Sequence, residues 1–297
     1  MSSSPAGRRP LPCAATARWS RLLRRLDMHM HTVASDGALY AGEMADACID
    51  EGLGAACVAD HDTLASTGEF ISAVKTAGIA SVSAVEYSSS FEGRELHILA
   101  YRFPEEKLAA AEEFGARCRR AKDEKDRRII QMLSERFSGL SVDEYDGFAY
   151  EKYLRGGNRA AKYVYSKGVC SKYSEYRILK NSLGLDDSLL PTTEETLSFI
   201  RDAGALSVLA HPGYYFRDGV MDRQMLQRLL KWGIMGIECL SPYNPGKEQY
   251  EYYRAFCRRH DLAVSAGSDS HGPVMSRRIG VPYADDTMCD ILERLEI

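Results

Sequence analysis

The stretch Asp27-Met28-His29-Met30-His31 decides the fold, because it places two imidazoles two residues apart in a hydrophobic, strand-like run. Residues i and i+2 of a strand project from the same face, so His29 and His31 could bind one metal ion from one side. The turn Ser35-Asp36-Gly37 follows closely, and we expect Asp36 to reach back toward the two histidines. The two histidines of a lone His-x-His pair are more often polar residues at the rim of a sheet than metal ligands. A metal site therefore requires further ligands elsewhere in the chain.

The same chemistry recurs along the chain, within apolar runs or at their ends. The further candidates are Asp60-His61-Asp62, Glu86, His97, His211, Asp269 and His271. Only His260, of the seven histidines, lies in a charged stretch. Considered alone, each of the other six histidines is expected to be a hydrogen-bonded residue in the core or at the rim of the fold. Together with three carboxylates they indicate a shared metal site, because ionisable groups are rarely buried without a partner. Imidazoles mixed with carboxylates suit Mn, Fe or Zn rather than calcium.

Length and composition are those of a globular protein that could hold one large α/β barrel or two ordinary domains. The chain has 297 residues, with 38 basic against 42 acidic side chains and a net charge of −4. This balance argues against a nucleic-acid coat or a membrane-surface protein, so any attraction for phosphate must be local and no stable DNA complex is expected. Eight cysteines without a Cys-x-x-Cys pair, and no apolar run of transmembrane length, predict a cytoplasmic protein with reduced thiols.

Periodicity predicts strands alternating with helices at short spacing. The expected strands cover residues 26–31, 55–59, 80–85, 96–101, 206–210, 236–240 and 262–267. The expected helices cover residues 42–52, 66–77, 192–203, 222–232, 249–260 and 286–297. Such alternation favours a parallel sheet, with the chemistry at the carboxyl ends of the strands.

With these motifs the chain resembles the PHP-domain metal-dependent phosphoesterases (polymerase and histidinol phosphatase superfamily), and within them the TrpH-like branch, which acts on nucleotides and short RNA. The matching segments occur in the family's order and cover residues 27–32, 35–37, 59–63, 85–87, 97–101, 210–213 and 267–272. The resemblance implies an α/β fold: a distorted seven-stranded (β/α)7 PHP barrel, with a helical insertion domain capping the active site.

The resemblance divides the chain into a barrel of residues 26–103 and 191–297, and a helical insertion of residues 104–190. Residues 1–25 are predicted to be a basic, disordered, non-catalytic extension. Lysines and arginines crowd residues 105–137, where interleaved acidic residues favour a solvated helix face over phosphate binding. Tyrosines of the insertion could stack on a base, but packing is the favoured interpretation for most of them.

The resemblance also implies two or three divalent metal ions, Mn, Fe or Zn. The nine implied ligands are His29, His31, Asp36, His61, Glu86, His97, His211, Asp269 and His271. One metal would be held by His29, His31, Glu86 and Asp269, a second by Asp36, His61 and His271, and a third by His97 and His211, with Glu86 bridging. The implied catalytic residues are Asp36, His61, Asp269 and His271. Asp60 or Asp62 is expected to orient a ligand imidazole, and Glu238 to lie behind the ligands.

Substrate contacts are less well defined, because the chain departs from the family at one motif. Family members commonly carry Gly-Arg-Pro-His, where this chain has Gly156-Gly157-Asn158-Arg159. We expect Arg155 or Arg159 to substitute for the family's arginine, and Arg277 to add positive charge at the barrel mouth.

The implied activity is hydrolysis of phosphate esters of nucleotides (AMP or nucleoside 3′,5′-bisphosphate type) or of 5′-phosphorylated short RNA, through a metal-activated hydroxide. The alternatives are a histidinol-phosphatase-like small-molecule phosphatase and a non-catalytic metal-binding PHP module. Nine filled ligand positions argue against the non-catalytic module.

Overall fold

The computed structural model describes residues 23–148, 156–216, 220–244 and 246–297, so most of the predicted basic extension lies outside the described residues. Seven strands in these ranges form two sheets. They are β1 (Leu26–Met30), β2 (Ala55–Val58), β3 (Ala84–Phe91), β4 (Arg94–Tyr101), β5 (Leu206–Leu209), β6 (Gly236–Leu240) and β7 (Ala263–Ala266). Strands β1 and β2 pair in parallel, and the larger sheet has the order β3-β4-β5-β6-β7. The predicted α/β class is confirmed.

Backbone hydrogen bonds join the two sheets at both edges. The amide of Asp269 donates to the carbonyl of His29 at 2.8 Å where β1 meets β7. At the other edge, the amide of Asp62 donates to the carbonyl of Glu86 at 3.0 Å. The strand ladders of the described residues do not themselves close into one barrel. We call these two junctions, β1 with β7 and β2 with β3, the seams of the sheets. Both seams involve segments that carry candidate metal ligands.

The predicted parallel arrangement is wrong for one side of the larger sheet. Strand β3 pairs antiparallel with β4, and β4 pairs antiparallel with β5, whereas β5, β6 and β7 are parallel. The two-residue turn Glu92-Gly93 has φ values of 54° and 76°, and positive φ at both positions is what a tight hairpin favours. Because β3 begins at Ala84 and continues to Phe91, Glu86 lies inside a strand and not at its end.

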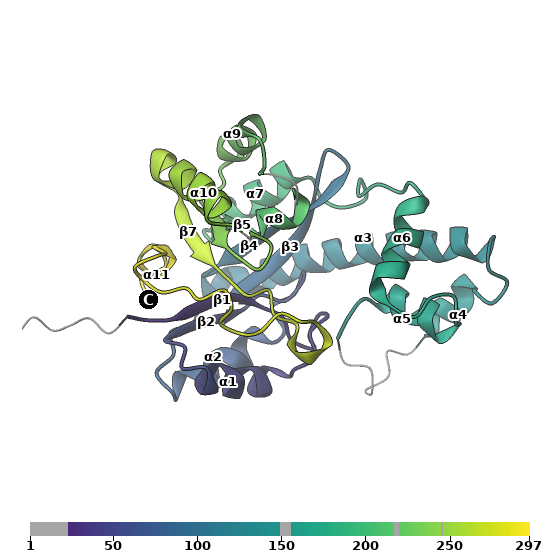
Figure 1. Cartoon of the computed structure of the whole chain (residues 1–297), viewed down its shortest axis with the longest axis horizontal. Coiled ribbons are helices and arrows are strands. Elements are labelled where there is room, and N and C mark those ends of the chain that lie inside the picture. Colours follow the sequence, from purple (N-terminus) through teal and green to yellow (C-terminus); the bar gives the residue numbers. More distant parts are fainter. Residues whose placement is uncertain (1–22, 149–155, 217–219, 245) are drawn as a thin grey trace, which may run out of the picture.

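Helices cover the outer faces of the strands (Figure 1). They are α1 (Ala41–Asp50), α2 (Thr67–Lys75), α7 (Thr193–Asp202), α9 (Arg223–Trp232), α10 (Lys247–His260) and α11 (Ile291–Arg294). Two short elements, α8 (Pro212–Tyr215) and the 3-10 turn η2 (Gly272–Val274), instead follow directly after His211 and His271. Helix α7 begins as its sequence predicts, since the Thr192 hydroxyl accepts from the Glu195 amide at 3.1 Å. The helix predicted over 286–297 is shorter, because the Asp285 carboxylate accepts from the Thr287 amide at 2.9 Å and holds a turn there.

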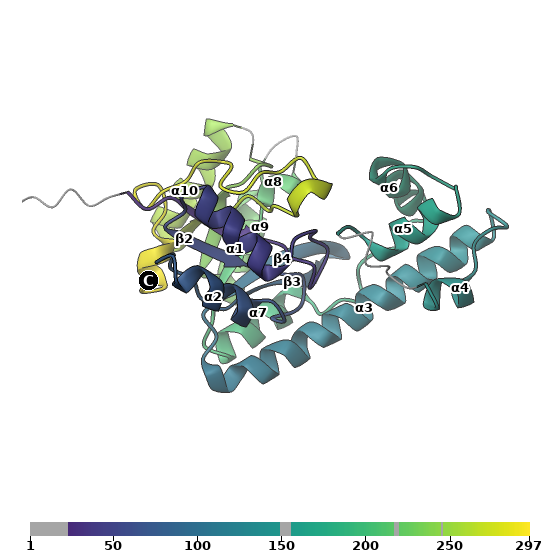
Figure 2. The same ribbon diagram turned by 90° about the horizontal axis from the view of Figure 1, so that it is seen from below.

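The predicted insertion, residues 104–190, lies between β4 and β5 in the chain, and its helices extend away from the sheets (Figures 1 and 2). Its described elements are the 3-10 turn η1 (Glu105–Lys107), α3 (Leu108–Ser134), α4 (Val142–Asp146), α5 (Arg159–Ser166) and α6 (Tyr173–Ser182). Helix α3 joins two hydrophobic cores, since Phe114 packs in the main core and Ile130 in a separate core of the insertion. Tyr163 and Tyr176 are each 1% exposed in that second core, so these two tyrosines serve packing.

Helix α3 also packs closely against the loop that carries His61. A β-carbon at Gly115 would overlap the carbonyl oxygen of Asp62, and Arg119 donates a hydrogen bond to the same oxygen. Glycine at this position therefore lets the helix backbone approach the His61 loop. None of the described helices combines the length and apolarity that a bilayer crossing requires.

Candidate metal centre

The nine predicted ligands converge from both seams of the sheets. Donor atoms of eight of them form three groups, each spanning no more than 4.8 Å: His29, His31, Glu86 and Asp269; His31, Asp36, His61 and His271; and His61, Glu86 and His97. His31, His61 and Glu86 each belong to two groups. The groups therefore form one continuous cluster.

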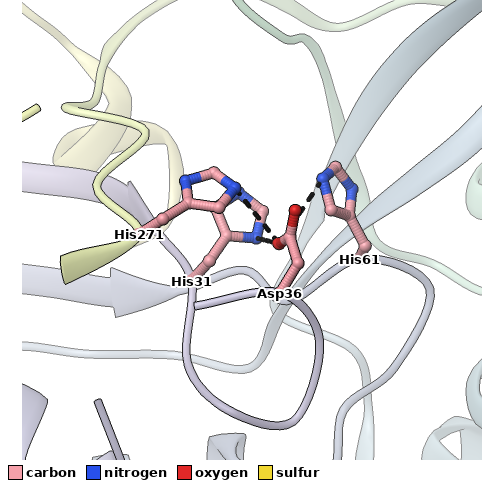
Figure 3. Close-up of side chains that lie close together, drawn as sticks. All are labelled: His31, Asp36, His61 and His271. Carbon is pink, nitrogen blue, oxygen red and sulfur yellow. Dashed lines mark ion pairs between the residues drawn. The ribbon is translucent and has the colours of Figure 1, made fainter. Parts of the chain in front are cut away.

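Asp36 holds the second group together (Figure 3). Its Oδ1 lies 3.1 Å from His271 Nε2, 3.8 Å from His31 Nδ1 and 3.9 Å from His61 Nε2. The loop turns back tightly at Gly37, where a β-carbon would overlap the carbonyl of His31. The sequence Ser35-Asp36-Gly37 thus returns a carboxylate to the strand from which the loop leaves.

Glu86 is fully buried and lies among five imidazoles. Its Oε2 lies 3.3 Å from His29 Nε2, 3.2 Å from His31 Nε2 and 3.0 Å from His61 Nδ1. Its Oε1 lies 3.0 Å from His97 Nδ1 and 2.8 Å from His211 Nε2. A carboxylate contacted from so many sides can contribute oxygens to more than one cation.

His211 and His97 both lie beside Oε1 of Glu86, where the resemblance implied a third ion with Glu86 bridging. His211 belongs to none of the three donor groups found among the described residues, and His61 stands with His97 and Glu86 in the third. The Nε2 of His211 lies within hydrogen-bond distance of Glu86. Its backbone has φ 26°, a conformation that non-glycine residues seldom adopt. The carboxylate of Glu238 helps to hold this backbone by accepting from the His211 amide at 2.8 Å.

The cluster has the donor properties that a divalent cation needs. Six of its buried polar atoms make no hydrogen bond within the described ranges: Nδ1 of His31, His61, His97 and His211, Oδ1 of Asp36, and Oε2 of Glu86. Nδ1 of His61 and Oε2 of Glu86 are only 3.0 Å apart, yet their geometry is not that of a hydrogen bond. Buried polar atoms without partners are costly, and a shared cation would satisfy them. The mixture of nitrogen and oxygen donors fits Mn, Fe or Zn.

Protonation states differ across the cluster. Burial and the charge of His271 lower the pKa of His31 to about 4, and burial lowers the pKa of His61 to about 4. Burial also acts to lower the pKa values of His29 and His97, but two carboxylates together outweigh it at each residue, Glu86 with Glu238 at His29 and Glu86 with Glu95 at His97, and raise both pKa values to about 10. Neutral imidazoles are therefore ready to donate lone pairs, whereas His29 and His97 would release protons on binding a cation.

Two carboxylates outside the donor groups orient ligand imidazoles. Glu238, expected to lie behind the ligands, places Oε1 3.1 Å from His29 Nδ1. Glu95, which the sequence reading missed, places Oε1 3.2 Å from His97 Nε2. Its signal was the two-residue spacing to His97 on one face of β4. Such partners fix the tautomer and direction of a ligand imidazole.

Asp60 and Asp62 serve the loops and not an imidazole, contrary to the expectation from their positions beside His61. The Asp60 carboxylate accepts from the amide and hydroxyl of Thr32, both at 2.7 Å. The Asp62 carboxylate accepts from the amide of Ser88 at 2.7 Å. These buried carboxylates fix the backbones that present the ligands.

A cleft of about 740 Å³ opens over the cluster between the sheets and the insertion. Arg277 lines it and donates to Asp269 Oδ2 and to the hydroxyl of Tyr243. Arg159 does not line the cleft; its guanidinium donates to the carbonyl of Tyr145 at 2.8 Å and stacks on that ring, inside the insertion. Arg155 lies outside the described residues.

The model of the PHP domain family matches residues 27–242, which is most of the chain. The chain belongs to the PHP domain family. The recognition of this family from the order of its motifs is thereby confirmed.

Curated PHP relatives match over nearly their full lengths. A 5′-3′ exoribonuclease of Haemophilus influenzae is 28% identical over 264 residues, which cover 85% of this chain and 92% of the relative. A 3′,5′-nucleoside bisphosphate phosphatase of Chromobacterium violaceum is 24% identical over 262 residues, which cover 84% of this chain and 88% of the relative. A crystal structure from Bifidobacterium adolescentis, described as a metal-dependent phosphoesterase, superposes with a TM-score of 0.71 at 25% identity, over 89% of this chain and 93% of that one.

Proposed function

We propose that this PHP protein is a metal-dependent phosphoesterase that hydrolyses phosphate esters of nucleotides, of the AMP or nucleoside 3′,5′-bisphosphate type, or of the 5′ end of short RNA. The observation that carries the proposal is the convergence of nine imidazole and carboxylate side chains on one cluster at a cleft lined by cations. The similarity to an exoribonuclease and to a nucleoside bisphosphate phosphatase supports the choice of esters.

Two or three divalent ions, Mn, Fe or Zn, would be held by the three donor groups, with Glu86 contributing to two of them. When bound, such ions neutralise the charge of a phosphate ester and lower the pKa of a water molecule, which supplies hydroxide near neutral pH. Because His31 and His61 are held neutral and the pKa values of Glu86 and Asp36 lie well below their usual range, the chain presents these donors ready to bind.

The remaining groups of the site would orient the substrate and the ligand imidazoles and shield the ester from water. Arg277, beside Asp269, is placed to contact an oxygen of the phosphate, while Glu238 and Glu95 keep His29 and His97 in position. The insertion would act as a cap domain that covers the cleft and limits water around the ester. The backbone hydrogen bonds at both seams support a distorted seven-stranded barrel made of residues 26–103 and 191–297.

The test is phosphate release by the Mn-loaded protein from AMP, adenosine 3′,5′-bisphosphate, a 5′-phosphorylated RNA oligomer and histidinol phosphate. Asp269→Ala should abolish release, and Asp202→Ala, at an exposed position at the end of α7, should leave it unchanged. Release from the nucleotides or the RNA supports the proposal. Release from histidinol phosphate alone, or no release from a protein shown to bind Mn, overturns it.

A further inference from the structure

One side chain of the insertion reaches the segments that carry the third donor group. This group consists of His61 on the loop after β2, Glu86 on β3 and His97 on β4. Lys122 of helix α3 lies beside these segments, and its side chain is 34% exposed. One residue of the insertion is therefore placed to act on all three ligands.

On the strands, Lys122 contacts the residues beside Glu86 and His97. Its Nζ donates to the hydroxyl of Ser88 at 3.1 Å. Ser88 shares a face of β3 with Glu86, two residues away, and stands directly opposite His97 in the β3–β4 pair. The same Nζ lies 3.7 Å from Oε1 of Glu95, the oxygen that lies 3.2 Å from His97 Nε2. Lys122 therefore holds the carboxylate that orients His97.

On the loop, Lys122 contacts the residue that follows His61. Its Nζ lies 3.7 Å from Oδ2 of Asp62, which also accepts from the Ser88 hydroxyl at 2.9 Å. The backbone carbonyl of Asp62 accepts from Arg119, one turn earlier on α3. Helix α3 thus holds Asp62 by its side chain and by its backbone. The direction in which His61 leaves the loop depends on both contacts.

The positive charge of Lys122 is matched by the two carboxylates. Burial acts to lower the pKa of Lys122, but the surrounding carboxylates, Asp62 and Glu95 foremost, outweigh it and raise the pKa above its usual value. In the part of the chain that the structure describes, neither carboxylate forms an ion pair with another lysine or with an arginine. A neutral side chain at this position would leave both carboxylates without their cation, so the two could separate.

We propose that Lys122 is a positioning residue for the ion held by His61, Glu86 and His97. Through Lys122, the insertion is a working part of the metal centre as well as a cover over it. The inference rests on the proposed function and deepens it, because it assigns the assembly of one ion site to helix α3. Lys122 is not itself a ligand, and it acts through the neighbours of all three ligands.

The test measures binding of Mn²⁺ alone, without substrate. Metal-free protein is titrated by calorimetry, and Mn-soaked crystals are measured at the manganese absorption edge. Lys122→Met should weaken one binding step by about 10- to 100-fold, as changes to the outer partners of ligand histidines do. In crystals of the variant, the anomalous peak beside His61, Glu86 and His97 should lose occupancy. The peak beside His29 should remain as the internal reference.

Three further variants separate positioning from a general effect on the fold. Lys122→Arg keeps the charge and should restore most of the affinity. Lys122→Gln keeps a hydrogen-bond donor for Ser88 and should weaken the same ion, which also serves if Lys122→Met does not fold. Arg120→Met removes a positive charge at an exposed position of the same helix and should titrate like the wild-type protein. Circular dichroism melting curves show which variants are folded.

Three results would overturn the inference. The first is wild-type Mn²⁺ binding by a folded Lys122→Met or Lys122→Gln protein, which would leave Lys122 as a residue that only lines the cleft. The second is an equal loss for every ion, and the third is a wild-type crystal without manganese beside His61, Glu86 and His97. None of these results depends on whether the Mn-loaded protein releases phosphate. Conversely, a protein in which Lys122 supports this ion but which hydrolyses none of the esters would refute the proposed function alone.

Discussion

Replacing Glu238 by glutamine tests how far the metal centre depends on residues that do not themselves bind the ions. Glu238 is fully buried on β6 and uses both oxygens. One lies 3.1 Å from His29 Nδ1, and the other accepts from the amide of His211 at 2.8 Å. Glutamine has nearly the same volume but only one carbonyl oxygen. One of the two neighbouring N–H groups would therefore face an NH₂ group and lose its acceptor.

The size of the effect follows from this lost acceptor. A buried donor left without a partner costs about 1–3 kcal/mol. At about 1.4 kcal/mol for each tenfold change, this corresponds to a loss of about 5- to 150-fold in affinity for the ion held by His29. Losses of about 10- to 100-fold are typical when the outer partner of a metal-ligating histidine is changed.

The assay is calorimetric titration of metal-free protein with Mn²⁺, together with the metal content after gel filtration. Glu238→Gln should weaken the tightest binding step by about 10- to 100-fold. Glu248→Gln, an identical change at an exposed position of α10, should titrate like the wild-type protein. Equal Mn²⁺ affinity for Glu238→Gln and the wild-type protein would show that Glu238 does not support the binding of the ion.

Three further predictions concern stability. Gly267→Ala should lower the free energy of unfolding by about 1–3 kcal/mol, because its β-carbon would overlap that of a candidate ligand. Gly68→Ala, where the added carbon meets nothing within 4 Å, should be neutral or slightly stabilising in urea titrations. Lys125→Met should lower the free energy of unfolding by about 3–5 kcal/mol, because Lys125 is 7% exposed and Asp187 would lose its partner. Adding Asp187→Leu should recover part of this loss. A double variant that recovers none of it would contradict a paired role for the two residues. Burial raises the pKa of Asp126 from 3.8 to about 6. Between these pH values the folded state therefore binds more protons than the unfolded state. The free energy of unfolding should then fall as the pH rises from about 4 to 6. Asp126→Asn should flatten that dependence, and an unchanged slope between pH 4 and 7 would show that another group is responsible.

The convergence of the candidate ligands could be predicted because most of them end apolar runs. His31, His211 and Asp269 follow buried strand segments, and only a shared site explains so many ionisable groups at such positions. His97 was found in the same way, although it lies within β4. Which of these residues share an ion could not be predicted from the sequence. The grouping depends on how the edges of the two sheets meet, and no local sequence pattern indicates those contacts.

The errors have local physical causes. Alternating strands and helices predicted a parallel sheet, but Glu92-Gly93 forms a hairpin whose first residue, Glu92, does not signal positive φ as Asn or Asp would. Arg159 was expected at the cleft because of its place in a family motif, yet three backbone carbonyls of the insertion take up its guanidinium.

We expect the nine side chains to form one centre for two or three divalent ions. The most direct measurement is X-ray diffraction from Mn-soaked crystals at the manganese absorption edge. Two or three anomalous peaks should appear within the cluster, one of them beside His29, His31, Glu86 and Asp269. Crystals that show manganese elsewhere on the protein, and no anomalous peak among these side chains, would contradict it.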